Sequence, residues 1–447
     1  MIVLSIVAIV FATILFFQHQ QTKYSWDKDL AERLAFDYSK TKDDVKAVIA
    51  EFIPDVTDAQ IDEWTADESK LESMVIDGQR RYFKRTARNL FRVDKACKAV
   101  YDSLHPEVWP EGHTIDDYAV APMIVNDVLE SGNPIAQPRT MKVRYTITVE
   151  PGYVPAGKMI KCWLPYPRTD VQRQTRVKFI SAGVNDNVIT DSTDVRLVFS
   201  GNASKHSTLF MKGPSLKDKP TVFHEEFEYT VSGEWHEIDS TKVLPYNKDS
   251  ELYKEFTSER EAHVIFTPEL RALADKITEG IKNPYNQVKA IYDYVDAFPW
   301  AGAREYSTIP NIPEYVCRVK HGDCGQQSLL LVTLCRIKGI PAHFQSGFMM
   351  HPQEWNMHDW SEVYFEGIGW VPVDVSFGKQ NFQPEYFYLG GIDPWRMIVN
   401  QDFGRELIPA KKYPRSETVD FQRGEVEWSK GNVYFNHWSW DMEIEYL

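Results

Sequence analysis

Hydrophobic positions fall into three successive patterns along this 447-residue chain. From residue 22 to about 110, apolar residues recur near the helical period among dense charges, which predicts several amphipathic helices. Near residue 136 the period changes to two, and alternating apolar and polar runs separated by turn residues predict strands. From about residue 250 helical and strand-like runs are mixed. The pattern therefore predicts an α+β fold with an N-terminal helical region.

The alternation is clearest at Met141–Val149 and at Trp438–Tyr446, where every second residue is apolar. Because successive side chains of a strand point to opposite faces, each of these strands has one apolar face. Several such strands over about 137–240 predict a small antiparallel β-sandwich. We expect the final strand to pack its aromatic face onto one of the β layers.

These patterns divide the chain into five parts. We predict a signal peptide or membrane anchor over 1–21, a helical region over 22–135 and an antiparallel β domain over 136–245. A catalytic core over 246–400 and a strand tail over 401–447 follow.

Residues 2–17 are almost wholly apolar and carry no charged side chain. A membrane-spanning helix needs about 20 residues, so this segment fits a signal-peptide core or a short anchor. It lacks a basic flank and a clear small-residue cleavage site before Gln18, so both alternatives stay open. Either predicts export to the periplasm or cell envelope, with membrane association if the segment is retained.

The composition narrows the class of protein further. The chain is 43% hydrophobic and 26% charged, which is typical of soluble multidomain proteins. A net charge of −14 argues against a nucleic-acid partner. Five cysteines are too few for a disulfide framework, and their odd number leaves a spare thiol.

A run of basic residues is expected to lie on a solvated helix face. Its residues are Arg80, Arg81, Lys84, Arg85 and Arg88.

Cys324 precedes an apolar run that is too dense for a one-faced helix, so we expect a buried helix that begins near this cysteine. Gly339 and Pro341 end it. At a helix N-terminus the dipole and the free backbone N–H groups favour a thiolate and could hold an oxyanion. Cys324 is therefore a candidate nucleophile.

His358 begins the first strand of a predicted hairpin, and Asp374 lies on the second. In chain order, a thiol, an imidazole and a carboxylate would act as nucleophile, base and orienting group. Three other carboxylates could orient the imidazole: Asp359, Glu362 and Glu366. Asp359 is adjacent to His358 and points to the opposite strand face, so Asp374 is preferred.

The histidines of this region could also suggest a metal site. The spacings of His321, His343, His351 and His358 relative to Cys324 match neither C-x-x-C nor H-E-x-x-H, so no metal is expected.

Four motifs carry a family resemblance: Gly322-Asp323-Cys324, Arg336–Ala342 (RIKGIPA), His358-Asp359-Trp360 and Trp370–Asp374 (WVPVD). Together they resemble the transglutaminase-like superfamily of papain-type thiol enzymes, over roughly residues 285–380. The whole chain looks like exported, multidomain bacterial members of that superfamily. The resemblance implies a papain-like core with Cys324, His358 and Asp374 as the catalytic triad.

Members of the superfamily often place an upstream aromatic residue near the oxyanion, and Trp300 and Tyr306 are the candidates for this role. Trp355, in the loop before His358, would either line a substrate cleft or cover the core. The chain departs from the family pattern at Val375, where proline is common, and at His343, where arginine is common.

The expected chemistry is attack of Cys324 on an amide bond of a peptide or protein, through an acyl-thioester. Hydrolysis by a protease or amidase is favoured because water is the default acceptor in an open cleft, and a crosslinking transglutaminase is the alternative. A binding or scaffold protein at the cell envelope with an unused triad is a second alternative. No cofactor is expected, and no D-x-[DN]-x-[DN]-G loop implies calcium. The sequence does not define the oligomeric state.

Overall fold

The structure is a computed structural model that describes residues 28–105 and 116–447. The predicted signal peptide or anchor lies outside these ranges, so export remains a prediction. No helix within the two ranges combines the length and apolarity that crossing a membrane requires.

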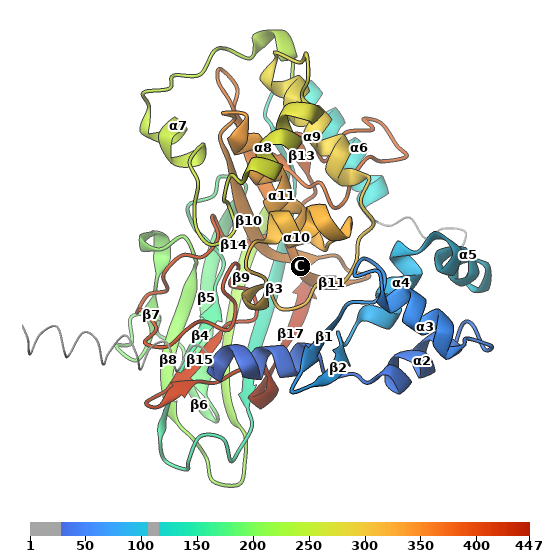
Figure 1. Ribbon diagram of the computed structural model, residues 1–447. Helices are drawn as coiled ribbons and strands as arrows, with labels where there is room; N and C mark the ends of the chain where they lie inside the picture. The colour runs from blue at the N-terminus through green and yellow to red at the C-terminus, as the bar shows by residue number, and fades with distance from the viewer. Residues whose placement is uncertain (1–27, 106–115) are drawn as a thin grey trace, which may run out of the picture.

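The N-terminal region forms a small body with its own apolar core, drawn in blue in Figure 1. A helix over residues 28–37 precedes its other elements. Those are α2 (Lys42–Ala50), α3 (Asp58–Thr65), β1 (Ser73–Ile76), β2 (Gln79–Tyr82), α4 (Thr86–Val93) and α5 (Lys95–Leu104). The helix α6 (Asp116–Ser131) then leads into the β domain.

The basic run does not lie on one helix, contrary to the prediction. Arg80 and Arg81 lie on β2 of a two-stranded hairpin, and only Arg88 is helical. The hairpin turns at Asp77 and Gly78, which both have positive φ. An Asp-Gly pair suits this tight turn, because both central residues of a type I′ turn need the left-handed region.

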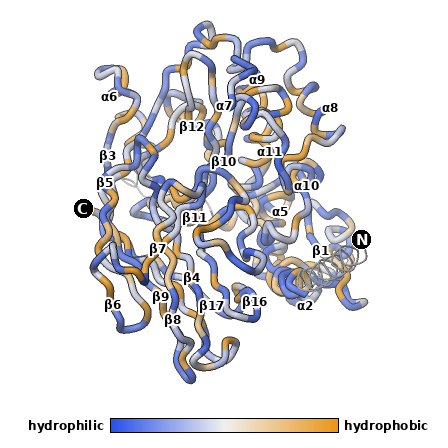
Figure 2. Tube along the Cα trace, turned by 90° about the vertical axis from the view of Figure 1, so that its left-hand side faces the viewer, coloured by the Kyte–Doolittle hydropathy of each residue, from blue (hydrophilic) through white to orange (hydrophobic). Residues whose placement is uncertain are grey.

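Two antiparallel sheets form the predicted β-sandwich around one large apolar core. Figure 2 shows hydrophobic and hydrophilic residues alternating along its strands. The strand order is β17-β3-β9-β5-β6 in one sheet, where β13 also pairs with β9, and β16-β15-β4-β8-β7 in the other. The bounds are β3 (Ile135–Val149), β4 (Met159–Pro165), β5 (Gln174–Val184), β6 (Asn187–Ile189), β7 (Val198–Phe199), β8 (Thr208–Pro214), β9 (Thr221–Trp235), β13 (Gly391–Ile392), β15 (Glu425–Trp428), β16 (Gly431–Asn432) and β17 (Trp438–Tyr446).

The C-terminal strands belong to both layers of the sandwich. The strand β17 pairs along β3, and β15 pairs with β4. Trp438 and Met442 of β17 are buried in the sandwich core, whereas the intervening Ser439 and Asp441 are exposed. The alternation read from the sequence thus matches the observed faces of this strand.

A four-stranded antiparallel sheet with helices on one face follows the sandwich, in the order β12-β11-β10-β14. Leucine and valine side chains of α11 pack onto β10, β11 and β12 in a second core. The predicted α+β class is therefore confirmed. The bounds are α7 (Glu251–Phe256), α8 (Pro268–Ile277), α9 (Pro284–Asp296), α10 (Ile312–Val319), α11 (Cys324–Ile337), β10 (Ala342–Met350), β11 (Trp355–Phe365), β12 (Gly369–Val373) and β14 (Arg396–Asn400).

Buried polar contacts join the N-terminal region to α10 (Ile312–Val319) and to the loop before it. Asn89 exchanges two hydrogen bonds with the Gly302 backbone, at 2.9 and 3.0 Å. Asp37 accepts the Glu305 backbone N–H at 2.8 Å, and Glu72 accepts the Tyr315 hydroxyl at 3.0 Å. Because these groups lose water on burial, their pairing fixes the N-terminal region beside the first turn of α11.

Candidate active site

Cys324 is the first residue of α11, as the sequence predicts. Asp323 caps the helix: its side chain accepts the Gln326 backbone N–H, and the Gln326 side chain accepts the Asp323 backbone N–H in return. This reciprocal capping box satisfies two of the otherwise unpaired N–H groups of the first turn. The rest of the helix is buried almost on all sides, so the position of the thiol is set by a rigid element.

Two backbone N–H groups beside the thiol stay unoccupied. Within the described ranges, neither the Cys324 nor the Gly325 N–H donates to any group. A Cβ at position 325 would lie 2.2 Å from the Tyr306 hydroxyl and 2.6 Å from Asp359 Oδ2, so the close approach requires glycine here. Helix N-terminal N–H groups of this kind can hold an oxyanion.

The thiol contacts Asp359 rather than His358. Cys324 Sγ–H donates to Asp359 Oδ2 at 3.4 Å, and no hydrogen bond joins Cys324 to His358 in the described part of the chain. Burial, followed by the carboxylates of Asp359 and Asp323, raises the pKa of the thiol well above its usual value. The resting site therefore holds a neutral thiol instead of a thiolate.

His358 and Asp374 are brought together. His358 Nε2 lies 2.7 Å from Asp374 Oδ2, and because a carboxylate only accepts, this nitrogen carries the hydrogen. The other ring nitrogen, Nδ1, makes no hydrogen bond with any described residue, so it is left as an acceptor. Burial lowers the pKa of His358 despite the opposing effect of Asp374, which favours the neutral imidazole.

Asp374 is held by a buried network. Arg396 Nη1 donates to Asp374 Oδ2 at 2.8 Å, and Arg396 Nε donates to Asp393 Oδ2 at 2.7 Å. The Ser376 hydroxyl donates to the second oxygen of Asp374 at 2.9 Å. Although burial alone raises the pKa of Asp374, His358 and Arg396 hold it below its usual value. The carboxylate is thus ionised and fixed in position.

Strand geometry explains why the thiol and the imidazole have different partners. His358 and Asp359 are consecutive on β11, so their side chains leave opposite faces of the strand. The Asp359 face packs against α11, where Ser328 donates to the Asp359 carbonyl oxygen at 3.5 Å. The Asp359 backbone N–H is also close enough to lower the pKa of the thiol. Cys324 therefore lies against the peptide group that links His358 to Asp359.

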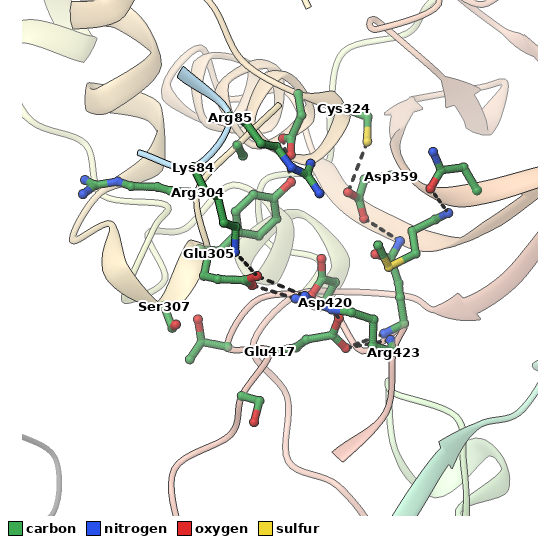
Figure 3. Close-up of a pocket in the computed structure, with 18 of the residues that line it drawn as sticks. Lys84, Arg85, Arg304, Glu305, Ser307, Cys324, Asp359, Glu417, Asp420 and Arg423 are labelled. Atoms are coloured by element: carbon green, nitrogen blue, oxygen red, sulfur yellow. Dashed lines mark hydrogen bonds and ion pairs between the residues drawn. The ribbon is translucent and has the colours of Figure 1, made fainter. Parts of the chain in front are cut away.

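The thiol opens into a pocket of about 190 Å³, shown in Figure 3. Four segments surround Cys324: the start of α4, the loop from Trp300 to Ser307, the start of β11, and the loop from Ser416 to Arg423. The pocket thus combines the N-terminal region, the predicted core and the C-terminal tail.

The three aromatic candidates for substrate binding differ in position. Trp300 lines the pocket and is 40% exposed. Tyr306 also lines it, and its hydroxyl donates to Asp323 Oδ1 at 2.6 Å beside the helix start. Trp355 is not among the lining residues, because its ring packs edge-on against Trp440 of the sandwich, with centroids 5.8 Å apart. The structure therefore brings two of the three to the site.

The sequence interpretation missed the residues that supply most of the charge in the pocket. Asp323 could have been recognised from its D-x-x-Q spacing to Gln326, which is a capping-box signal. The sequence indicates Asp359 only as an alternative partner of His358, and not as the group that accepts the Cys324 thiol hydrogen. Lys84 and Arg85, as well as the loop 416–423, reach the site through long-range packing that leaves no local pattern in the sequence.

The histidines considered as metal ligands are dispersed. His343 pairs with Glu362 at 2.8 Å, and His351 lies 3.8 Å from Asp393. Across residues 28–105 and 116–447, no group of three or more His, Cys, Asp or Glu side chains is arranged to hold a metal ion.

Asp359→Asn is expected to make Cys324 more reactive at neutral pH. Removing the carboxylate next to the thiol removes a cause of its raised pKa, so more thiolate forms at a given pH. Iodoacetamide alkylation of the Cys324 peptide, followed by mass spectrometry at pH 7.5, should be several-fold faster than in the wild type. Glu354→Gln, an exposed substitution with the same charge change outside the pocket, is the control; equal rates in both variants would refute the role given to Asp359.

Comparisons with known proteins agree with the motifs. Residues 271–375 match the family described as the transglutaminase-like superfamily. The uncharacterized protein YebA of Bacillus subtilis (strain 168) is 23% identical over 252 residues, which are 50% of this chain and 34% of that protein. The chain therefore spans about a third of the length of this relative.

Two solved structures are also similar. A Cytophaga hutchinsonii protein described as "a Putative Cysteine Protease" has a TM-score of 0.44 and 14% identity, over 70% of this chain and 92% of that one. The periplasmic domain of TgpA from Pseudomonas aeruginosa has a TM-score of 0.27 and 12% identity, over 53% and 88% of the two chains.

The matched segment contains the helix that begins at Cys324, the strand that carries His358, and Asp374 at the end of the next strand. Residues 271–375 of this chain are therefore a domain of the transglutaminase-like superfamily.

Proposed function

We propose that this protein is a cysteine acyl-transfer enzyme that cleaves amide bonds of peptides or proteins through an acyl-thioester on Cys324. One observation carries the proposal: a thiol at a helix start opens into a pocket and lies against the peptide group that follows His358, whose ring is held by Asp374. The arrangement supplies a nucleophile at the pocket and, on the neighbouring strand, a base with its orienting carboxylate.

The first step is general-base activation of the thiol. Because burial keeps the thiol neutral and leaves the imidazole unprotonated, the site starts without a thiolate–imidazolium pair. To give its proton to the free Nδ1 of His358, the thiol must leave Asp359 and come within hydrogen-bond reach of the imidazole, because His358 and Asp359 point to opposite faces of β11 in the resting site. Asp374 then stabilises the imidazolium through Nε2–H.

Attack on the amide carbonyl gives a tetrahedral intermediate. Its oxyanion would accept hydrogen bonds from the free N–H groups of Cys324 and Gly325. His358 then returns the proton to the leaving amine, which departs and leaves the acyl-thioester. Tyr306, hydrogen-bonded to the helix cap, holds Asp323 against this end of α11.

Water is the proposed acceptor of the acyl group, which makes the protein a protease or amidase. The pocket is open to solvent and the same histidine can activate water, so hydrolysis needs no further group. Transfer to an amine would instead make a crosslinking transglutaminase, and it follows the same steps as far as the thioester.

A peptide-library incubation with mass-spectrometric detection separates these functions. Hydrolysis yields new carboxylic acids, and transfer to added amines yields new amides. The proposal expects acids that appear with wild-type protein and are absent with Cys324→Ala. If wild-type protein yields neither product, the protein is a binding or scaffold protein with an unused triad and the proposal fails.

A further inference from the structure

The pocket around Cys324 contains more carboxylates than its own cations neutralise. Arg423 forms ion pairs with both Glu305 and Glu417, at 2.7 and 2.6 Å. Lys84 pairs with Asp37 at 3.1 Å, outside the pocket lining, and more distantly with Glu305 at 3.9 Å. These pairs account for two of the lining carboxylates and leave others next to the thiol without a cationic partner.

Among the described residues, three lining carboxylates have no ion pair: Asp323, Asp359 and Asp420. Asp323 is occupied as the cap of α11, where it accepts the Tyr306 hydroxyl and the Gln326 backbone N–H, so Asp359 and Asp420 remain. Asp359 accepts the thiol hydrogen at Oδ2 and the Gln422 amide at Oδ1, both from uncharged groups. Asp420 is only 7% exposed, and among the described residues its carboxylate has neither a hydrogen bond nor an ion pair. Figure 3 shows both residues at the pocket together with Cys324.

The arginines nearest to Asp420 are occupied elsewhere. Arg423 is held by Glu305 and Glu417, whereas Arg415 donates to the backbone carbonyl oxygens of Arg405 and Asp420. A nearly buried carboxylate without a partner is costly to keep, and natural proteins pair such groups. A carboxylate that lines a cavity and lacks a protein partner is therefore available to a ligand.

We propose that Asp420 and Asp359 form a subsite that binds a primary ammonium group beside Cys324. An ammonium has three donors and can bridge two carboxylates once both are ionised. Burial raises the pKa of both carboxyl groups, so binding of the cation is coupled to loss of their protons. The inference rests on the proposed function and names the substrate class: the peptide or the acceptor that meets the thiol carries a free amine. The amine belongs either to the acyl substrate, as an α-amino group or lysine side chain, or to an incoming acceptor.

Charged thiol reagents test the subsite without any turnover. The probes are 2-aminoethyl methanethiosulfonate, a cation, and 2-sulfonatoethyl methanethiosulfonate, an anion of similar size. The ratio of their rates at Cys324, measured by peptide mass spectrometry, cancels the thiolate fraction because the same thiolate attacks both reagents and displaces methanesulfinate from each. We expect the cation to react faster in the wild type by about tenfold or more.

Asp420→Asn should lower this ratio several-fold, while Glu354→Gln, with the same change in net charge, should leave it near the wild-type value. Because the Asp420 side chain bonds to no described residue, the variant should fold normally, and Asp420→Ala provides a second test. If the ratio is the same in both Asp420 variants and in Glu354→Gln, the subsite does not exist. That result would leave the proposed acyl-thioester chemistry untouched.

Turnover then distinguishes the two sources of the amine. If the amine is on the acyl side, N-acetylation of a cleaved peptide lowers kcat/KM in the wild type but not in Asp420→Asn. If it is on the acceptor, added 1,5-diaminopentane yields amide product, and Asp420→Asn lowers the ratio of amide to acid. When neither substrate dependence appears, the ammonium assignment is overturned even if both variants remain active.

Discussion

Cys324→Ala is expected to abolish amide-bond cleavage, with kcat/KM lowered by about a thousandfold or more, because no other group replaces the attacking sulfur. The folded protein should be little affected. The thiol ends in an open pocket and makes one weak hydrogen bond, so the free energy of unfolding should change by less than about 1 kcal/mol. Product formation by mass spectrometry and thermal unfolding measure the two effects separately.

Cys335→Ala is the matched control, because this cysteine lies on the same helix and is fully buried in the apolar core. Its loss leaves a cavity, which should cost roughly 1–3 kcal/mol of stability while kcat/KM stays within a few-fold of the wild type. The opposite pattern would show that Cys324 is a packing residue and that the chemistry lies elsewhere.

Arg396→Met is expected to destabilise the fold by about 3–5 kcal/mol, the largest loss that a single substitution around this site should cause. The guanidinium is fully buried and bridges Asp374 and Asp393. Methionine would leave two buried carboxylates without their cation, which costs much more than losing the attraction itself. Urea unfolding of the two proteins measures the difference.

The dependence on pH provides a further check of Arg396. The arginine lowers the pKa of both Asp374 and Asp393 in the folded protein. Groups with lowered folded pKa values contribute stability above their unfolded pKa, near 4, and lose that contribution as the pH falls through the folded value. The difference between wild type and Arg396→Met should therefore shrink below about pH 4.

An exposed pair is the control for this substitution. Arg196 pairs with Asp194 at the surface, with 53% of its side chain exposed, so Arg196→Met should leave the urea unfolding transition close to that of the wild type. Equal losses in the two variants, or a loss at Arg396 that does not change with pH, would contradict the role of the buried network.

Local patterns predicted the fold well where one face of an element is buried. The alternation at Met141–Val149 and Trp438–Tyr446 corresponds to β3 and β17, which pair along their length. The dense apolar run after Cys324 corresponds to α11, buried almost on all sides. The prediction that the basic run lies on one helix is wrong, because charged residues suit both helices and exposed hairpins. The Asp77-Gly78 pair is the turn signal that favours the hairpin.

The site was predictable only in part. Antiparallel pairing of β11 and β12 places Asp374 near His358, and the turn between the strands in the sequence indicates this pairing. The contact of Cys324 with Asp359 depends on how α11 is placed against β11, which no local pattern specifies. The charges of Arg85 and Asp420 come from segments far along the chain, so only the folded structure brings them to the thiol.

The central claim is that His358 serves as the base for Cys324, although the resting thiol contacts Asp359. The direct test is the rate of iodoacetamide alkylation at Cys324 from pH 5 to 10, in wild-type protein and in His358→Ala. The account predicts that the wild type reacts about tenfold or more faster near pH 7 and that the two rates converge at high pH, where the thiol ionises without help. Superimposable profiles that follow an isolated thiol in both proteins would contradict it.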